Sequence, residues 1–121
     1  MTGYHVSPAE NRLGIWRWGL IPRDTGSHPR SHYHDVAHDN HGVEAVYVHL
    51  DRDAALYWRQ RYGARPQYPC SATDVWAVDL TGLELEKDAY VWELDTLATS
   101  RRCLTRIGPE RLTLVHAGRV R

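Results

Sequence analysis

Three ring-bearing side chains are placed where they could bind a flat ligand: His5, Tyr47 and Tyr57. His5 lies within the short extended segment 4–6, and Tyr47 lies within the alternating run 43–50. Because side chains of a strand alternate between its two faces, both residues are predicted to point away from their apolar neighbours. Tyr57 follows Tyr47 by ten residues, so the two phenol rings could enclose a planar aromatic group.

The segment after His5 is predicted to be a helix over residues 8–18. Ser7 is a favourable N-cap, a proline follows it at the first helical position, and Glu10 can close a capping box. Apolar side chains recur at helical spacing as far as Leu20, and Gly19 is a favourable helix stop. A strand that carries a histidine is therefore expected to lead directly into a helix.

The segment around Tyr47 repeats this arrangement. Residues 43–50 predict a strand, and Asp51 can cap a second helix that ends at Gly63. Further short strands are predicted over residues 75–80, 83–85, 102–106 and 112–116. Two helices with five or six short strands predict an α+β domain, and 121 residues fit one domain over residues 1–121.

A long loop, residues 22–42, separates these two units and holds five histidines. Loops of this length in compact domains are often lids or binding loops. His32, His34 and His38 have spacings that could ligate zinc with an aspartate. No cysteine joins them and no regular element fixes their geometry, so we predict no metal site. The favoured interpretation is a lid, and the alternative is a loop that gives one histidine to an acceptor site.

Composition excludes several classes of protein. Hydrophobic residues make up 42% and charged residues 25%, which are values typical of a folded globular domain. Fifteen basic and fifteen acidic residues cancel, which does not favour a strongly basic nucleic-acid clamp. No apolar run is long enough to span a membrane, and no signal peptide is visible. The two cysteines are predicted to be free thiols, so we expect a cytoplasmic protein.

Four segments, in this order, resemble ADP-ribosyltransferase-like domains. The family's histidine strand and following helix resemble YHVSPAENRLGIWRWGLIPR (residues 4–23). Its tyrosine strand, followed by a helix with a second aromatic residue, resembles VEAVYVHLDRDAALYW (residues 43–58). The rifampin ADP-ribosyltransferases have a strand and Thr-Gly turn before an acidic stretch, similar to VWAVDLTGLELEKD (residues 75–88). The terminal strand of many small members resembles IGPERLTLV (residues 107–115).

This resemblance implies an α+β fold, an ADP-ribosyltransferase-like split β-sandwich with two main helices. It also implies a His-Tyr-acid site that takes NAD as substrate. His5 matches the histidine that hydrogen-bonds the ribose next to nicotinamide. Tyr47 matches the tyrosine that stacks on nicotinamide, and Tyr57 approximates its partner.

The resemblance offers two acids. Asp88 matches the rifampin-type position and is favoured, whereas Glu110 matches the glutamate before the last strand of other small members. A carboxylate near the ribose would stabilise the positive charge that builds as the nicotinamide bond breaks. Arg12 and Arg52, near the starts of the two predicted helices, are candidates for the pyrophosphate, because guanidinium groups bind phosphates in a bidentate manner.

The predicted function is NAD-dependent ADP-ribosyl transfer to an unknown acceptor, which could be a protein, a nucleic acid or a small molecule. Two alternatives stay open. One is a non-catalytic module of the same fold that binds NAD, another nucleotide or a protein. The other is an RNA 2′-phosphotransferase-like enzyme, which the basic residues near the end of the chain permit.

Overall fold

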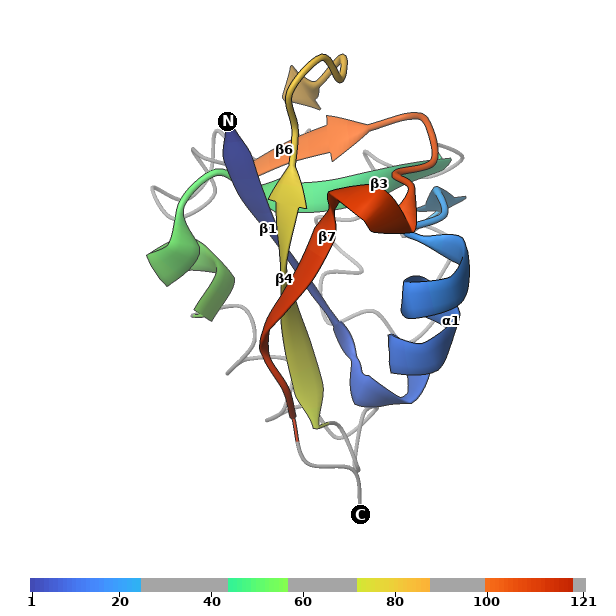
Figure 1. The fold of residues 1–121 in the computed structure, drawn as a ribbon. Helices are drawn as coiled ribbons and strands as arrows, with labels where there is room; N and C mark the ends of the chain where they lie inside the picture. The colour runs from blue at the N-terminus through green and yellow to red at the C-terminus, as the bar shows by residue number, and fades with distance from the viewer. Residues whose placement is uncertain (25–43, 57–71, 88–99, 119–121) are drawn as a thin grey trace.

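The computed structural model describes residues 1–24, 44–56, 72–87 and 100–118, which form an antiparallel sheet with one α-helix beside it (Figure 1). The strands are β1 (Thr2–Pro8), β2 (Arg23–Asp24), β3 (Glu44–His49), β4 (Thr73–Asp79), β5 (Glu86–Lys87), β6 (Ser100–Cys103) and β7 (Leu112–His116). The helical elements are the 3₁₀ turns η1 (Ala9–Asn11) and η4 (Pro109–Arg111), the helix α1 (Arg12–Trp18) and a stretch at residues 52–56.

The strands follow the order β5-β6-β3-β1-β4-β7, with β2 paired to β3. All pairs are antiparallel, but they differ in extent. β1 pairs with β4 along its whole length, from Thr2 to Pro8, whereas β1 and β3 share only the pair Tyr4 and His49. In Figure 1, β3 and β6 run across the direction of β1, β4 and β7. The sheet therefore changes direction where β1 meets β3.

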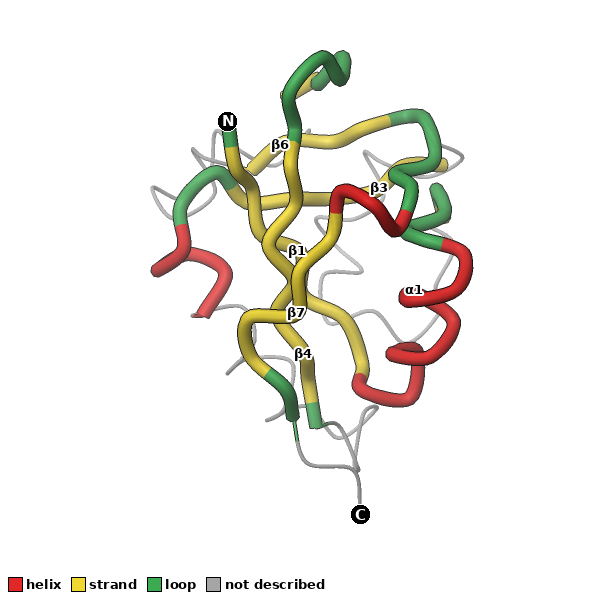
Figure 2. Tube along the Cα trace, viewed as in Figure 1, coloured by secondary structure: helices red, strands yellow, loops and turns green. Residues whose placement is uncertain are grey.

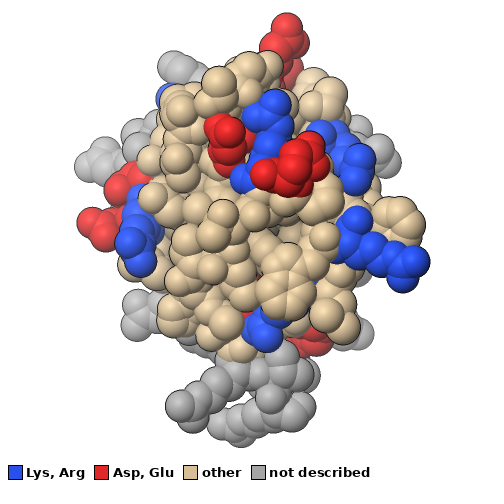
Figure 3. Space-filling model, in the orientation of Figure 1, with Lys and Arg blue, Asp and Glu red and all other residues tan. Residues whose placement is uncertain are grey.

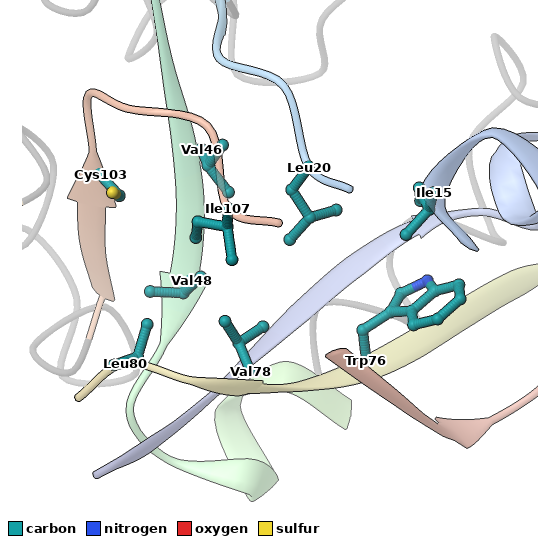
Figure 4. Close-up of a cluster of buried hydrophobic side chains, with 9 residues drawn as sticks. All are labelled: Ile15, Leu20, Val46, Val48, Trp76, Val78, Leu80, Cys103 and Ile107. Carbon is teal, nitrogen blue, oxygen red and sulfur yellow. The ribbon is translucent and has the colours of Figure 1, made fainter. Parts of the chain in front are cut away.

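The core fills the space between these two parts of the sheet and the segment around α1 (Figure 4). Valines of β3 and β4 face one another there, and Trp76 extends the cluster toward Ile15 of α1. Two backbone hydrogen bonds, of 2.9 and 3.0 Å, join Leu20 and Ile107. Gly19 precedes this bridge with φ +80°, and a Cβ there would collide with the carbonyl oxygen of Ile107. Only glycine fits this conformation and this close approach.

The predicted fold class, an α+β split β-sandwich with two main helices, is wrong. Figure 2 shows that strands are the most extensive regular structure of the described chain, and α1 is the one complete α-helix within it. The predicted second helix is represented in the described residues only by residues 52–56. The sequence overstated the first helix because the predicted span 8–18 divides into the 3₁₀ turn η1 and the seven-residue α1.

The start of the first helix also differs from the prediction. Ser7 does not cap it, since Ser7 and Pro8 still pair with Asp74 and Thr73 of β4. The chain leaves the sheet after Pro8 and makes the 3₁₀ turn η1, which has no side-chain cap, before α1 begins. Pairing along the whole edge of β4 therefore outweighs the local capping preference.

Three further segments differ from the prediction. Residues 23–24, predicted as loop, form β2. Residues 83–85, predicted as a short strand, form none, and β5 follows them at Glu86–Lys87. The strand predicted over residues 102–106 is found at Ser100–Cys103.

The surface carries charges of both signs. Figure 3 shows basic and acidic side chains interspersed over the face in view, in keeping with equal numbers of each in the sequence. Among the helices that the structure describes, none has the length and apolar character needed to cross a membrane.

Candidate functional site

His5 and Tyr47 come together where β1 and β3 diverge. The Nδ1 atom of His5 lies 2.7 Å from the carbonyl oxygen of Tyr47. A carbonyl oxygen only accepts hydrogen bonds, so Nδ1 carries the proton and donates it. In the neutral ring this places the lone pair on Nε2. The imidazole thus joins β1 to the backbone of β3, and its unprotonated nitrogen is Nε2.

Burial keeps this imidazole neutral. Desolvation lowers the pKa of His5, although the hydrogen bond to the Tyr47 carbonyl acts in the opposite direction. The pKa of His49 is lowered to about 4, first by burial and then by the charge of His5, while Asp51 opposes both. His5 and His49 therefore lie close enough to repel when charged. Near pH 7 both rings are neutral.

The side chain of Tyr47 belongs to a cross-strand row of polar groups. Tyr47 of β3 is directly opposite Arg102 of β6, which is opposite Glu86 of β5. Arg102 Nε donates to Glu86 Oε2 over 2.7 Å. Burial acts to lower the pKa of Arg102, but the hydrogen bonds and charges of Glu86 and Tyr47 raise it overall. The Tyr47 hydroxyl is buried and lies close enough to the Arg102 guanidinium to raise the pKa of that group. The ring is therefore held beside a cation.

The position of His5 on the sheet differs from the prediction. His5 is opposite Trp76 of β4, and directly opposed residues of an antiparallel pair share a face. Trp76 belongs to the core, so His5 points to the core side of β1. On this side Ser7 Oγ and Trp76 Nε1 are buried and have no hydrogen-bond partner among the described residues. β1 lies inside the sheet with neighbours on both sides, so alternation alone did not reveal which face is apolar.

Arg12 binds a buried carboxylate that sequence analysis missed. Its Nε and Nη2 donate to the two oxygens of Asp74 over 2.9 and 2.8 Å, and Nη2 also donates to the carbonyl oxygen of Gly118 over 2.7 Å. Asp74 is completely buried and accepts a further hydrogen bond from the Gly118 N–H. The only signal for this pair was an aspartate inside the apolar strand TDVWAVD. Arg12 has a structural partner, and pyrophosphate binding by Arg12 stays a prediction.

Glu110 lies just before β7. It is exposed in η4, with its carboxylate against Gly108. The register places Gly3 opposite Val78, and Val78 opposite Leu112, so the strand that follows η4 pairs with β4 and not with β1. The role of Glu110 as the acid stays a prediction.

The other predicted site residues are distributed as follows. Arg52 is exposed at the start of the helical stretch 52–56, beside Asp51, whose Oδ1 lies 3.4 Å from the backbone N–H of Asp53. Tyr57 and Asp88 lie outside the described residues, as do most of the histidine-rich loop and Cys70. Within the described ranges no group of histidine, cysteine, aspartate and glutamate could hold a metal ion.

No protein-family model matches the chain, and no curated protein matches it. Function must therefore be inferred from the side chains themselves.

Proposed function

We propose that the chain is an NAD-dependent ADP-ribosyltransferase whose site is centred on His5 and Tyr47. One observation carries the proposal: the His5 imidazole donates through Nδ1 to the Tyr47 carbonyl oxygen at the divergence of β1 and β3. This contact brings together two residues that are 42 positions apart in the sequence. The proposal rests on these residues and not on the fold class.

The protonation state of His5 suits the binding of a ribose. With Nδ1 donating to a carbonyl and the pKa lowered by burial, Nε2 of His5 is an acceptor near pH 7. A ribose hydroxyl is a donor that matches it. His5 then orients the sugar without gaining or losing a proton. Tyr47 matches the tyrosine that stacks on nicotinamide, and its backbone carbonyl oxygen holds the His5 ring in place.

The reaction breaks the bond between the ribose C1′ and the nicotinamide nitrogen, and nicotinamide leaves with the bonding electrons as a neutral molecule. The acceptor nucleophile then bonds to C1′ and loses its proton. Positive charge on the sugar is stabilised by a carboxylate, a contact worth about 3 kcal/mol of barrier in a site shielded from water. We assign this role to Asp88, because it matches the rifampin-type position and is the favoured of the two acids.

The test measures NAD binding by calorimetry and nicotinamide release by chromatography. The expected result is that His5→Ala weakens NAD binding at least tenfold, because the ribose loses its acceptor. His116→Ala is the matched control: this half-buried histidine lies on β7 and should leave binding unchanged. Tyr47→Phe should retain binding and Tyr47→Ala should lose it, as stacking requires. Absence of NAD binding by the wild-type chain would refute the proposal.

A second candidate, a module that binds NAD without turnover, is favoured by the exposed position of Glu110 in η4, before a strand that does not pair with β1. Asp88→Asn and Glu110→Gln separate the two. For an enzyme, Asp88→Asn abolishes nicotinamide release while NAD still binds, and Glu110→Gln changes neither. NAD binding with no release by the wild-type chain identifies the module.

We also propose that the protein works in the reducing cytoplasm, which the free, buried thiol of Cys103 supports.

A further inference from the structure

The outer face of α1 is apolar where a surface helix is usually polar. Leu13 is 76% exposed and Trp16 is 50% exposed, and both lie on one side of the helix at a spacing of three residues. The ring centroids of Trp16 and the core residue Trp76 lie 5.8 Å apart in an edge-to-face arrangement, so this contact fixes the position of the Trp16 indole. Exposed apolar groups gathered on one helix face mark an interaction surface.

The two ends of this face carry opposite charges. Glu10 is exposed in η1, three residues before Leu13, and Arg17 is exposed four residues after it. Arg12 adds no free positive charge at the Glu10 end, since its ion pair with Asp74 neutralises it. At the other end Arg106 adds a second cation, whose Nε donates to the Trp18 carbonyl oxygen over 2.6 Å. Figure 3 shows basic side chains at the edge of the molecule that α1 forms.

A face that is negative at one end, apolar in the middle and positive at the other end is complementary to itself after a two-fold rotation. Rotation about an axis near Leu13 makes two copies of α1 antiparallel, with Glu10 of each copy beside Arg17 of the other. The two Leu13 side chains meet at the axis. Gly14 is exposed, and a Cβ there would meet nothing within 4 Å, so the second helix can approach closely. A two-fold interface requires this kind of self-complementary surface.

We propose that this face of α1 binds a second copy of the chain as an antiparallel, two-fold symmetric dimer. The proposal is independent of the proposed function, because it involves neither His5 nor Tyr47. One short helix from each copy makes a small contact, so the dimer is a weak one, with a dissociation constant in the micromolar range. An aromatic side chain at the centre and charges at the rim are the usual composition of such contacts.

The experiment is a charge reversal measured by sedimentation velocity from about 1 μM to about 1 mM, the range in which a weak contact associates. Glu10→Arg and Arg17→Glu each place like charges together at both ends of the interface. Each variant should weaken the dimer about tenfold or more. The double variant, Glu10→Arg with Arg17→Glu, restores both pairs and should recover most of the wild-type affinity. Leu13→Asp should abolish the dimer.

The control is Arg52→Glu, which reverses an exposed charge on the stretch 52–56 and should leave the dissociation constant unchanged. Circular dichroism of every variant checks that the sheet is folded. A wild-type chain that stays monomeric up to about 1 mM overturns the proposal. So does a double variant that dimerises no better than either single one, because it shows that Glu10 and Arg17 do not face each other. Association that appears only with added RNA or protein also overturns it.

Discussion

The two sides of β1 are built in different ways. Toward β4, every residue of β1 is paired, and the Arg12–Asp74 ion pair ties α1 to this side over 2.8 Å. Toward β3, one pair of residues forms, and the next contact is the bond from the His5 ring to the Tyr47 backbone. On the first side backbone groups satisfy one another, whereas on the second a side chain replaces a backbone donor.

Under the proposed function, this difference separates the side of β1 that supports the fold from the side that binds the ligand. A continuous ladder buries its polar groups and leaves none for a ligand. A junction where strands diverge exposes backbone and side-chain groups that must be satisfied in other ways, here by neutral His5. Variants on the two sides should therefore affect different properties, stability on the β4 side and ligand binding on the β3 side.

The largest effect is expected on the β4 side. Asp74→Ala removes a fully buried carboxylate that accepts hydrogen bonds from Arg12 and Gly118, and it leaves the guanidinium without its partner. The free energy of unfolding should fall by about 4 kcal/mol, measured by urea denaturation. Asp79→Ala, an exposed position at the end of the same strand, should cost far less. Equal losses for both would show that the Asp74 ion pair does not hold this side together.

The next effect is a loss of stability in acid on the β3 side. The pKa of His49 is about 4 in the folded chain and 6.5 in an ordinary environment. Below pH 6.5 His49 binds a proton in the unfolded chain but not in the folded chain. Its contribution to the free energy of unfolding is therefore fully present above pH 6.5 and is lost as the pH decreases toward 4. The loss amounts to about 3 kcal/mol. The lowered pKa of His5 acts in the same direction.

Comparison with His49→Asn isolates this contribution, because asparagine does not titrate and carboxylates affect both proteins alike. The difference in unfolding free energy between the two proteins should narrow as the pH falls from 7 to 4.5. Parallel curves over this interval would mean that His49 is not kept neutral by its surroundings.

His5→Ala should have a smaller effect on stability and a larger one on binding. It removes one hydrogen bond to the Tyr47 carbonyl, so unfolding should become easier by about 1 kcal/mol. Thermal unfolding monitored by circular dichroism gives this value, and NAD calorimetry on the same sample gives the loss of binding. A loss as large as that of Asp74→Ala would show that the two sides of β1 do not differ.

The smallest effect is expected from Glu86→Gln, which lies farther out on the β3 side. Its carboxylate is 47% exposed and pairs with Arg102. Solvent screens such a pair, so its loss should change stability by less than about 0.5 kcal/mol in urea denaturation. A larger change would indicate that the row of Glu86, Arg102 and Tyr47 acts as a unit, and Arg102→Gln should then reproduce it.

Elements with a clear local pattern were predictable. Residues 112–116 alternate after a Gly-Pro break, and β7 has those same bounds. β3, Glu44–His49, falls inside the predicted run 43–50. The turn at residues 81–82 was also predicted, and Gly82 adopts φ +78° there. These features depend only on neighbouring residues, which a sequence displays directly.

Features that depend on distant partners were not predictable. The place of Asp74 inside the apolar strand TDVWAVD hints at burial, but nothing local identifies its partner Arg12, which is 62 positions away. The prediction placed the rings of His5 and Tyr47 together, whereas the structure joins the His5 ring to the Tyr47 backbone. That contact arises because β1 and β3 share a single pair, a property of tertiary geometry.

Gly118 offers a spectroscopic consequence. Its N–H donates over 2.8 Å to the buried carboxylate of Asp74, while its carbonyl oxygen receives Arg12. An amide proton held by a charged, sheltered acceptor exchanges slowly with deuterated solvent. In a nitrogen-proton correlation spectrum this one glycine signal therefore reports whether α1, β4 and the chain after β7 are held together by the hydrogen bonds of Asp74. Following that signal during unfolding would show whether the hydrogen bonds among Arg12, Asp74 and Gly118 break before the rest of the sheet unfolds or together with it.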